Sequence, residues 1–106
     1  MILIADSGST KTHWCLVDEN KNIRHLFTQG FNPYMQSGEY IAGALKTELL
    51  PQLTREDHSS IAKIFYYGAG CAGSAKVMEV SRAIRKNFPS PELEVEHDLL
   101  AAARAL

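Results

Sequence analysis

The chain has 106 residues, of which 45% are hydrophobic and 22% are charged, and its formal net charge is -1. This length fits one domain or part of a larger protein, and the hydrophobic fraction is sufficient for a packed core. Nucleic acid and anionic membrane surfaces are not expected as partners, because both require clustered Lys and Arg, so we expect a small molecule or a protein instead.

The first predicted elements are three strands in an antiparallel meander. Residues 1–5 are an unbroken apolar run, which is typical of a central strand covered on both faces. Residues 12–17 and 23–28 are rich in aromatic and β-branched side chains, and the polar residues 18–22 separate them.

Helical and strand patterns alternate in the remainder of the chain. A loop at residues 30–38 precedes a helix with Ser37 as its N-cap, and Pro51 should end or kink that helix. A turn at residues 54–57 then leads into a largely apolar strand at residues 61–67.

A second helix follows, with Ser74 as its N-cap and an inner stripe of apolar residues at helical spacing. Residues 93–96 form a short strand, and residues 99–106 begin a last helix. The order β-β-β-α-β-α-β-α predicts an α/β fold with a mixed five-stranded sheet and helices on its faces. The chain ends within that last helix, so we expect it to be a fragment or one domain of a longer protein.

Three polar clusters follow predicted strand ends, at residues 6–12, 68–73 and 97–98. Ligand loops gather at the carboxyl ends of parallel strands, so these clusters could converge on one edge of the sheet. In the first cluster Gly8 would allow a close approach of backbone N–H groups to an anion, and Asp6 could hold a hydrated divalent cation. An ordinary hairpin turn is the alternative, because Asp, Ser and Gly are common turn residues.

The remaining candidate residues give weaker signals. The four histidines, His13, His25, His58 and His97, show no metal-ligand spacing and are interpreted as solvated or core residues. The two cysteines, Cys15 and Cys71, are too few for a zinc set or a disulfide framework and are typical of thiols in a reducing compartment. No apolar run reaches the roughly 18 residues of a membrane span, and the start of the chain lacks a secretory leader. We expect a cytoplasmic protein.

Four motifs in order resemble those of one protein family. They are the run Asp6-x-Gly8-x-Thr10 within "IADSGSTKT", the loop "GFNPYMQSG", the small-residue loop "GAGCAG", and "EHDLLAAA". Together they resemble the N-acetylglucosamine kinase-like, BadF/BadG/BcrA/BcrD-type ATPase family, within the superfamily of actin, heat-shock chaperones and sugar kinases. The resemblance implies a ribonuclease H-like, actin-like ATPase domain across the whole chain.

The resemblance also implies roles for individual residues. Asp6 would lie near a Mg²⁺ ion, Asn32 would reach substrate hydroxyls, and Asp98 would be the base beside the attacking sugar hydroxyl. The β- and γ-phosphates of ATP would be lined by Gly8, Ser9, Thr10 and Lys11. The substrate wall would include Gly70, Cys71 and Ala72. Asp98 is equally suited to be the N-cap of the helix that follows it, and the two roles are compatible.

Family members have two similar domains that close on the nucleotide, whereas this chain corresponds only to the N-terminal lobe, residues 1–106. The implied partners are a sugar, a nucleotide, the missing C-terminal lobe and, through an apolar face left exposed, a second copy in a homodimer. The leading hypothesis is the lobe of an ATP-dependent sugar kinase that is inactive alone. The alternatives are an ATPase that activates a partner reductase and a non-catalytic binding module.

Overall fold

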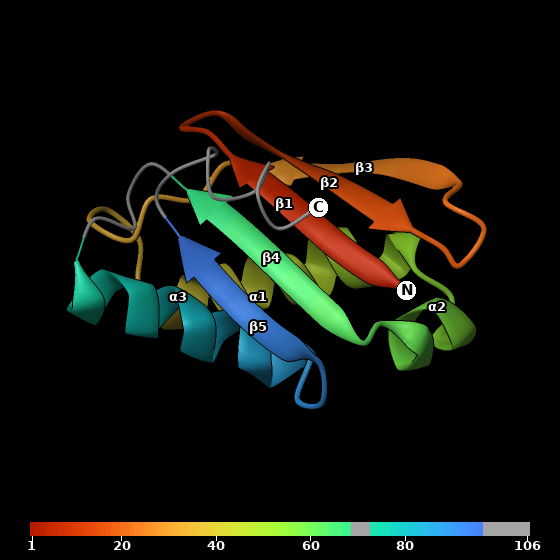
Figure 1. Ribbon diagram of the computed structural model, residues 1–106. Coiled ribbons are helices and arrows are strands. Elements are labelled where there is room, and N and C mark those ends of the chain that lie inside the picture. Colours follow the sequence, from red (N-terminus) through yellow and green to blue (C-terminus); the bar gives the residue numbers. More distant parts are fainter. Residues whose placement is uncertain (69–72, 97–106) are drawn as a thin grey trace.

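The computed structural model contains one mixed sheet of five strands in the order β3-β2-β1-β4-β5 (Figure 1). The structure describes residues 1–68 and 73–96. Antiparallel pairing joins β1 to β2 and β2 to β3, whereas β4 runs parallel to both β1 and β5. The strands are β1 (Ile2–Ser7), β2 (Lys11–Val17), β3 (Ile23–Gln29), β4 (Lys63–Gly68) and β5 (Glu92–Glu96). The predicted meander and its central first strand are confirmed.

The polar segment between β2 and β3 forms a tight hairpin connection. The Asp18 carboxylate accepts hydrogen bonds from the backbone N–H groups of Asn20 and Asn22, each at 2.9 Å. Lys21 takes a left-handed conformation with φ of 63°. This local chemistry sets the register in which Val17 stands opposite Ile23.

The first helical segment begins where the sequence predicts. Ser37 caps α1 (Gly38–Ala44), and its hydroxyl accepts the N–H of Tyr40 at 3.1 Å. The helix continues through the π-helical turn η1 (Leu45–Leu49) and the 3-10 turn η2 (Leu50–Gln52). Pro51 therefore lies in the final turn of the segment, as expected for a helix terminator.

The turn predicted at residues 54–57 is instead the start of a short helix, α2 (Arg55–Ser60). The Thr54 hydroxyl accepts the N–H of Asp57 at 3.0 Å, and the Asp57 carboxylate accepts the N–H of Thr54 at 2.8 Å. This reciprocal capping box satisfies N–H groups that a helix start leaves without partners. The strand predicted from residue 61 accordingly begins later, at Lys63.

The longest described helix is α3 (Ser74–Asn87). Its N-cap is Gly73 rather than Ser74, which is the first helical residue. The predicted apolar stripe faces inward, with Val80, Ile84 and Phe88 each at most 1% exposed.

Helices α1 and α3 lie side by side on one face of the sheet (Figure 1). The main core fills the space between them and the sheet, and it includes Leu3, Trp14 and Ile64, all fully buried. The opposite face carries a smaller apolar cluster around Phe65 and Tyr67. The last predicted helix, at residues 99–106, lies outside the described residues. Among the described helices, none is long and apolar enough to cross a membrane.

Candidate functional site

The carboxyl ends of three strands lie together at one end of the sheet. Because β1, β4 and β5 are parallel, Ser7 pairs with Gly68 and Tyr67 pairs with Glu96 at these strand ends. The first polar cluster and the start of the second therefore lie at neighbouring strand ends, whereas the third, at residues 97–98, lies outside the described residues. Four of the predicted site residues lie outside the described residues, namely Gly70, Cys71, Ala72 and Asp98.

The connection between β1 and β2 forms both a hairpin tip and one wall of a hollow. The N–H of Gly8 donates to the carbonyl of Lys11 at 2.9 Å, which closes the turn. A hollow of about 420 Å³ lies beside it. Its lining consists of Asp6, Gly8, Ser9, Thr10, Lys11, His13 and Phe27. The hairpin interpretation and the ligand-binding interpretation of this segment are thus compatible.

Asp6 and Lys11 bring opposite charges into this hollow without pairing with each other. Both side chains are exposed, and within residues 1–68 and 73–96 neither forms an ion pair. The Lys11 ammonium lies 5.6 Å from the centroid of the Phe27 ring. A free carboxylate oxygen is a ligand that Mg²⁺ prefers, and a free ammonium suits phosphate oxygens. The side chains therefore fit a magnesium polyphosphate.

A buried chain of hydrogen bonds supports the base of the turn. The Thr12 hydroxyl donates to the carbonyl of Gln29 at 2.9 Å and lies 2.8 Å from the Ser7 hydroxyl. Since Thr12 has one hydroxyl proton, Ser7 must donate to Thr12. Ser7 in turn accepts the N–H of Phe31 at 3.2 Å. The ends of β1, β2 and β3 are therefore fixed to one another beneath the hollow.

Gly30, which sequence analysis did not single out, lies directly against the turn. A Cβ atom at Gly30 would be 2.2 Å from the carbonyl oxygen of Gly8 and 2.8 Å from the nitrogen of Thr10. A Cβ atom at Gly8 would meet only an ordinary contact, 3.4 Å from the Lys11 oxygen. The close backbone approach therefore requires a glycine at position 30. The presence of a glycine in the loop after β3 was the available signal.

Asn32 is not among the residues that line the hollow. Its side-chain oxygen accepts the N–H of Tyr34 at 3.0 Å, and its backbone N–H donates to the Gln36 side chain at 2.8 Å. These bonds shape the loop before α1. In the part of the chain that the structure describes, the side-chain NH₂ group of Asn32 makes no hydrogen bond, so this donor is available to a ligand.

Two of the histidines that were interpreted as solvated or core residues without metal-ligand spacing are in fact neighbours. His13 and His25 are joined by a ring-nitrogen contact of 2.7 Å, and the Cys15 sulfur lies next to both. Linear spacing concealed this cluster because it forms across the β2–β3 pairing. The alternating His13-x-Cys15 pattern on a predicted strand was a usable signal, since such residues share a face.

A second hollow, of about 210 Å³, lies near the amino-terminal end of β1, and Arg24 and Asp57 are among the residues that line it. A hydrogen bond from the Arg24 guanidinium, at 2.5 Å, is the main cause that lowers the pKa of the Asp57 carboxyl below its usual value. Both groups are occupied in holding the start of α2. Because Arg24 and Asp57 pair with each other, we assign this hollow a structural role. The hollow beside the β1–β2 turn is lined by the unpaired charges of Asp6 and Lys11 and is the better candidate site.

Comparison with known proteins gives one informative result. No protein-family model matches the chain, and no curated protein matches it. Among solved structures, it is similar to a protein of Porphyromonas gingivalis provisionally named N-acetylglucosamine kinase, with 44% sequence identity and a TM-score of 0.85. The match covers 100% of this chain, which spans 37% of the length of that protein. The resemblance to N-acetylglucosamine kinase-like proteins and the α/β fold class are thereby confirmed.

Proposed function

We propose that this chain, a kinase-like polypeptide similar to the N-terminal portion of N-acetylglucosamine kinase-like proteins, is the phosphate- and substrate-binding lobe of an ATP-dependent sugar kinase. The observation that carries the proposal is the 44% identity to the Porphyromonas gingivalis protein along the whole chain. The hollow with unpaired Asp6 and Lys11 supports it, because phosphoryl transfer needs a metal ligand and a cation near the phosphates.

The residues of the β1–β2 turn would bind the phosphates of ATP. The Lys11 ammonium would neutralise phosphate oxygens, and the hydroxyls of Ser9 and Thr10 would donate hydrogen bonds to them. Asp6 would hold Mg²⁺, directly or through water, and that ion supplies charge neutralisation between the phosphates when it is bound. The Gly8 N–H is already bonded within the turn, so what Gly8 would contribute is the absence of a side chain beside the phosphates.

N-acetylglucosamine or a related sugar would be the acceptor. The free NH₂ group of Asn32 would donate to a sugar hydroxyl. Asp98 would orient the attacking hydroxyl and take its proton late in the reaction, a task that an ordinary carboxylate performs because the transition state is loose. A sugar kinase is preferred to an ATPase that activates a reductase, because the similar solved structure is named as a kinase.

The test is a phosphorylation assay on the complete gene product with ATP, Mg²⁺ and a panel of amino sugars and neutral sugars. We expect release of ADP that depends on N-acetylglucosamine or a close relative. The variants Asp6→Asn and Asp98→Asn should each lower kcat by at least about 100-fold, Asp98→Asn through loss of a positioned base and Asp6→Asn through loss of a ligand to Mg²⁺. Asp98→Asn should retain sugar binding.

Glu56→Gln is the matched control, because Glu56 is an exposed acid on α2, away from the β1–β2 turn. It should leave turnover unchanged. Sugar-independent ATP hydrolysis together with bound iron in the complete gene product would favour the reductase-activating alternative. Full turnover in Asp98→Asn would refute the assignment of the base.

A further inference from the structure

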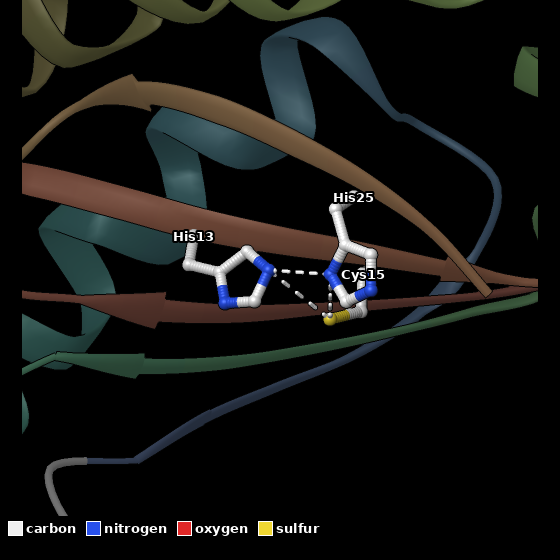
Figure 2. A group of neighbouring side chains, drawn as sticks. All are labelled: His13, Cys15 and His25. Carbon is white, nitrogen blue, oxygen red and sulfur yellow. Dashed lines mark hydrogen bonds between the residues drawn. The ribbon is translucent and has the colours of Figure 1, made fainter.

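Three side chains of types that can ligate a metal meet on the sheet face opposite α1 and α3. Figure 2 shows His13 and Cys15 from β2 beside His25 from β3. Alternation along β2 puts His13 and Cys15 on one face, and Cys15 stands directly opposite His25 in the strand register. One donor atom from each residue lies within 4.8 Å of the other two.

The distances among the donors are close to those of a tetrahedral metal site. The Cys15 Sγ atom lies 3.6 Å from His13 Nε2 and 3.7 Å from His25 Nδ1. With ordinary zinc bond lengths, tetrahedral ligands have a sulfur–nitrogen separation of about 3.6 Å and a nitrogen–nitrogen separation of about 3.3 Å. Both sulfur distances match, whereas the two ring nitrogens, 2.7 Å apart, would have to separate slightly.

The surroundings of the two rings allow the ring nitrogens to separate. The His13 ring stacks on Phe27 with centroids 4.8 Å apart, and on His25 with centroids 4.9 Å apart. Phe27 and His25 thus hold the His13 ring in place. His25 is exposed on β3, an edge strand of the sheet, so its ring has room to turn outward by the roughly 0.6 Å required.

A hydrogen-bonded cluster of the two histidines and the cysteine is the simplest alternative explanation. It accounts for the contact between the ring nitrogens, but the single thiol proton of Cys15 can be donated to only one of the two nitrogens, which lie almost equally far from the sulfur. A cation that binds thiolate strongly would displace the thiol proton of Cys15 to solvent.

We propose that His13, Cys15 and His25 bind one divalent cation of the Zn²⁺ class, with water as the fourth ligand. Two imidazole nitrogens and a thiolate suit Zn²⁺, whereas Mg²⁺ and Ca²⁺ prefer oxygen ligands. On binding, a metal–sulfur bond forms and the thiol proton leaves to solvent, with no change of oxidation state. This site is independent of the proposed kinase activity, although His13 also lines the hollow beside the β1–β2 turn.

The test is a titration of the purified, phosphine-reduced chain with Co²⁺, followed by optical absorption. We expect one equivalent to give the visible bands of tetrahedral cobalt and a thiolate-to-cobalt charge-transfer band in the near ultraviolet. Zn²⁺ should displace the cobalt and abolish both signals. Zn²⁺ should also raise the unfolding midpoint, because it binds the folded state and joins β2 to β3.

Variants identify the ligands. Cys15→Ser should lose the charge-transfer band, and His25→Gln should weaken cobalt binding at least about tenfold while preserving the fold, since His25 is exposed. Cys71→Ser is the matched cysteine control and should keep both signals. A charge-transfer band that survives Cys15→Ser or disappears in Cys71→Ser would overturn the proposal. So would a wild-type chain, folded by circular dichroism, that shows only weak octahedral cobalt bands.

Discussion

At the scale of single residues, Gly30 decides whether the β1–β2 turn can keep its shape. In Gly30→Ala the added methyl group would overlap the backbone of Gly8 and Thr10, so the turn or the following loop must move. We expect a loss of about 1–3 kcal/mol in the free energy of unfolding, as for other overpacked sites. Urea unfolding measures the loss, and amide chemical shifts of Ser9 and Thr10 should report the displaced turn.

Gly43→Ala is the matched control for this substitution. Gly43 lies inside α1, and a Cβ atom there would meet nothing within 4 Å. Alanine should therefore stabilise the chain by about 0.5–1 kcal/mol, because it is the better helix former. If both variants were equally stable, the close contact at Gly30 would not exist in solution.

At the scale of secondary-structure elements, α2 depends on the ion pair and cap formed by Asp57. Its carboxylate accepts from Arg24 and from the backbone of Thr54, and these bonds lower its pKa in the folded state. The stabilisation is therefore complete above the unfolded pKa of about 4 and is lost as the pH falls toward the lower folded value.

Asp57→Ala should accordingly destabilise the chain by about 1–2 kcal/mol at pH 7, the range expected for loss of a helix cap. The difference between wild type and variant should shrink below about pH 4, because the wild-type carboxyl then becomes protonated. Urea unfolding at pH 7, 5 and 3 measures this dependence, with Glu56→Ala as the exposed control. A difference that stays constant with pH would contradict the role assigned to the charge.

The elements that the sequence predicted well are those whose signals are local. Ser37 is an N-cap directly before its own helix, and the polar residues 18–22 form the turn between the two strands that they join. The start of α2 was also encoded locally, as a Thr54-x-x-Asp57 capping box, but turn residues and cap residues are of the same types. Arg24, the ion-pair partner of Asp57, lies 33 residues away in the sequence, and no local pattern indicates that contact.

The candidate site follows the same rule. Asp6, Gly8 and Lys11 were identified because they lie within six consecutive residues around one turn, and all three line the hollow. Gly30 and the cluster of His13, Cys15 and His25 depend on which strands pair and in what register. Pairing is a property of the folded sheet, so residues that meet across strands had to await the structure.

At the scale of the whole molecule, the turn and its hollow would form only one side of the proposed nucleotide site. The chain spans 37% of the Porphyromonas gingivalis protein, and catalysis of phosphoryl transfer depends on groups positioned around the phosphates from several directions. A lobe that contacts ATP only through Asp6, Lys11 and two hydroxyls buries little of the ligand. The ordering cost of binding is then offset by few contacts.

We therefore expect the 106-residue chain alone to bind ATP with a dissociation constant above about 1 mM, which corresponds to less than about 4 kcal/mol. It should release no sugar-dependent ADP. Chemical-shift titration with ATP and Mg²⁺ measures the affinity, and any shifts should centre on residues 6–11 and be reduced by Lys11→Met. Tight binding, or turnover at the rate of ordinary kinases, would mean that this lobe suffices for the chemistry and that Asp6 and Lys11 act without a second set of phosphate contacts.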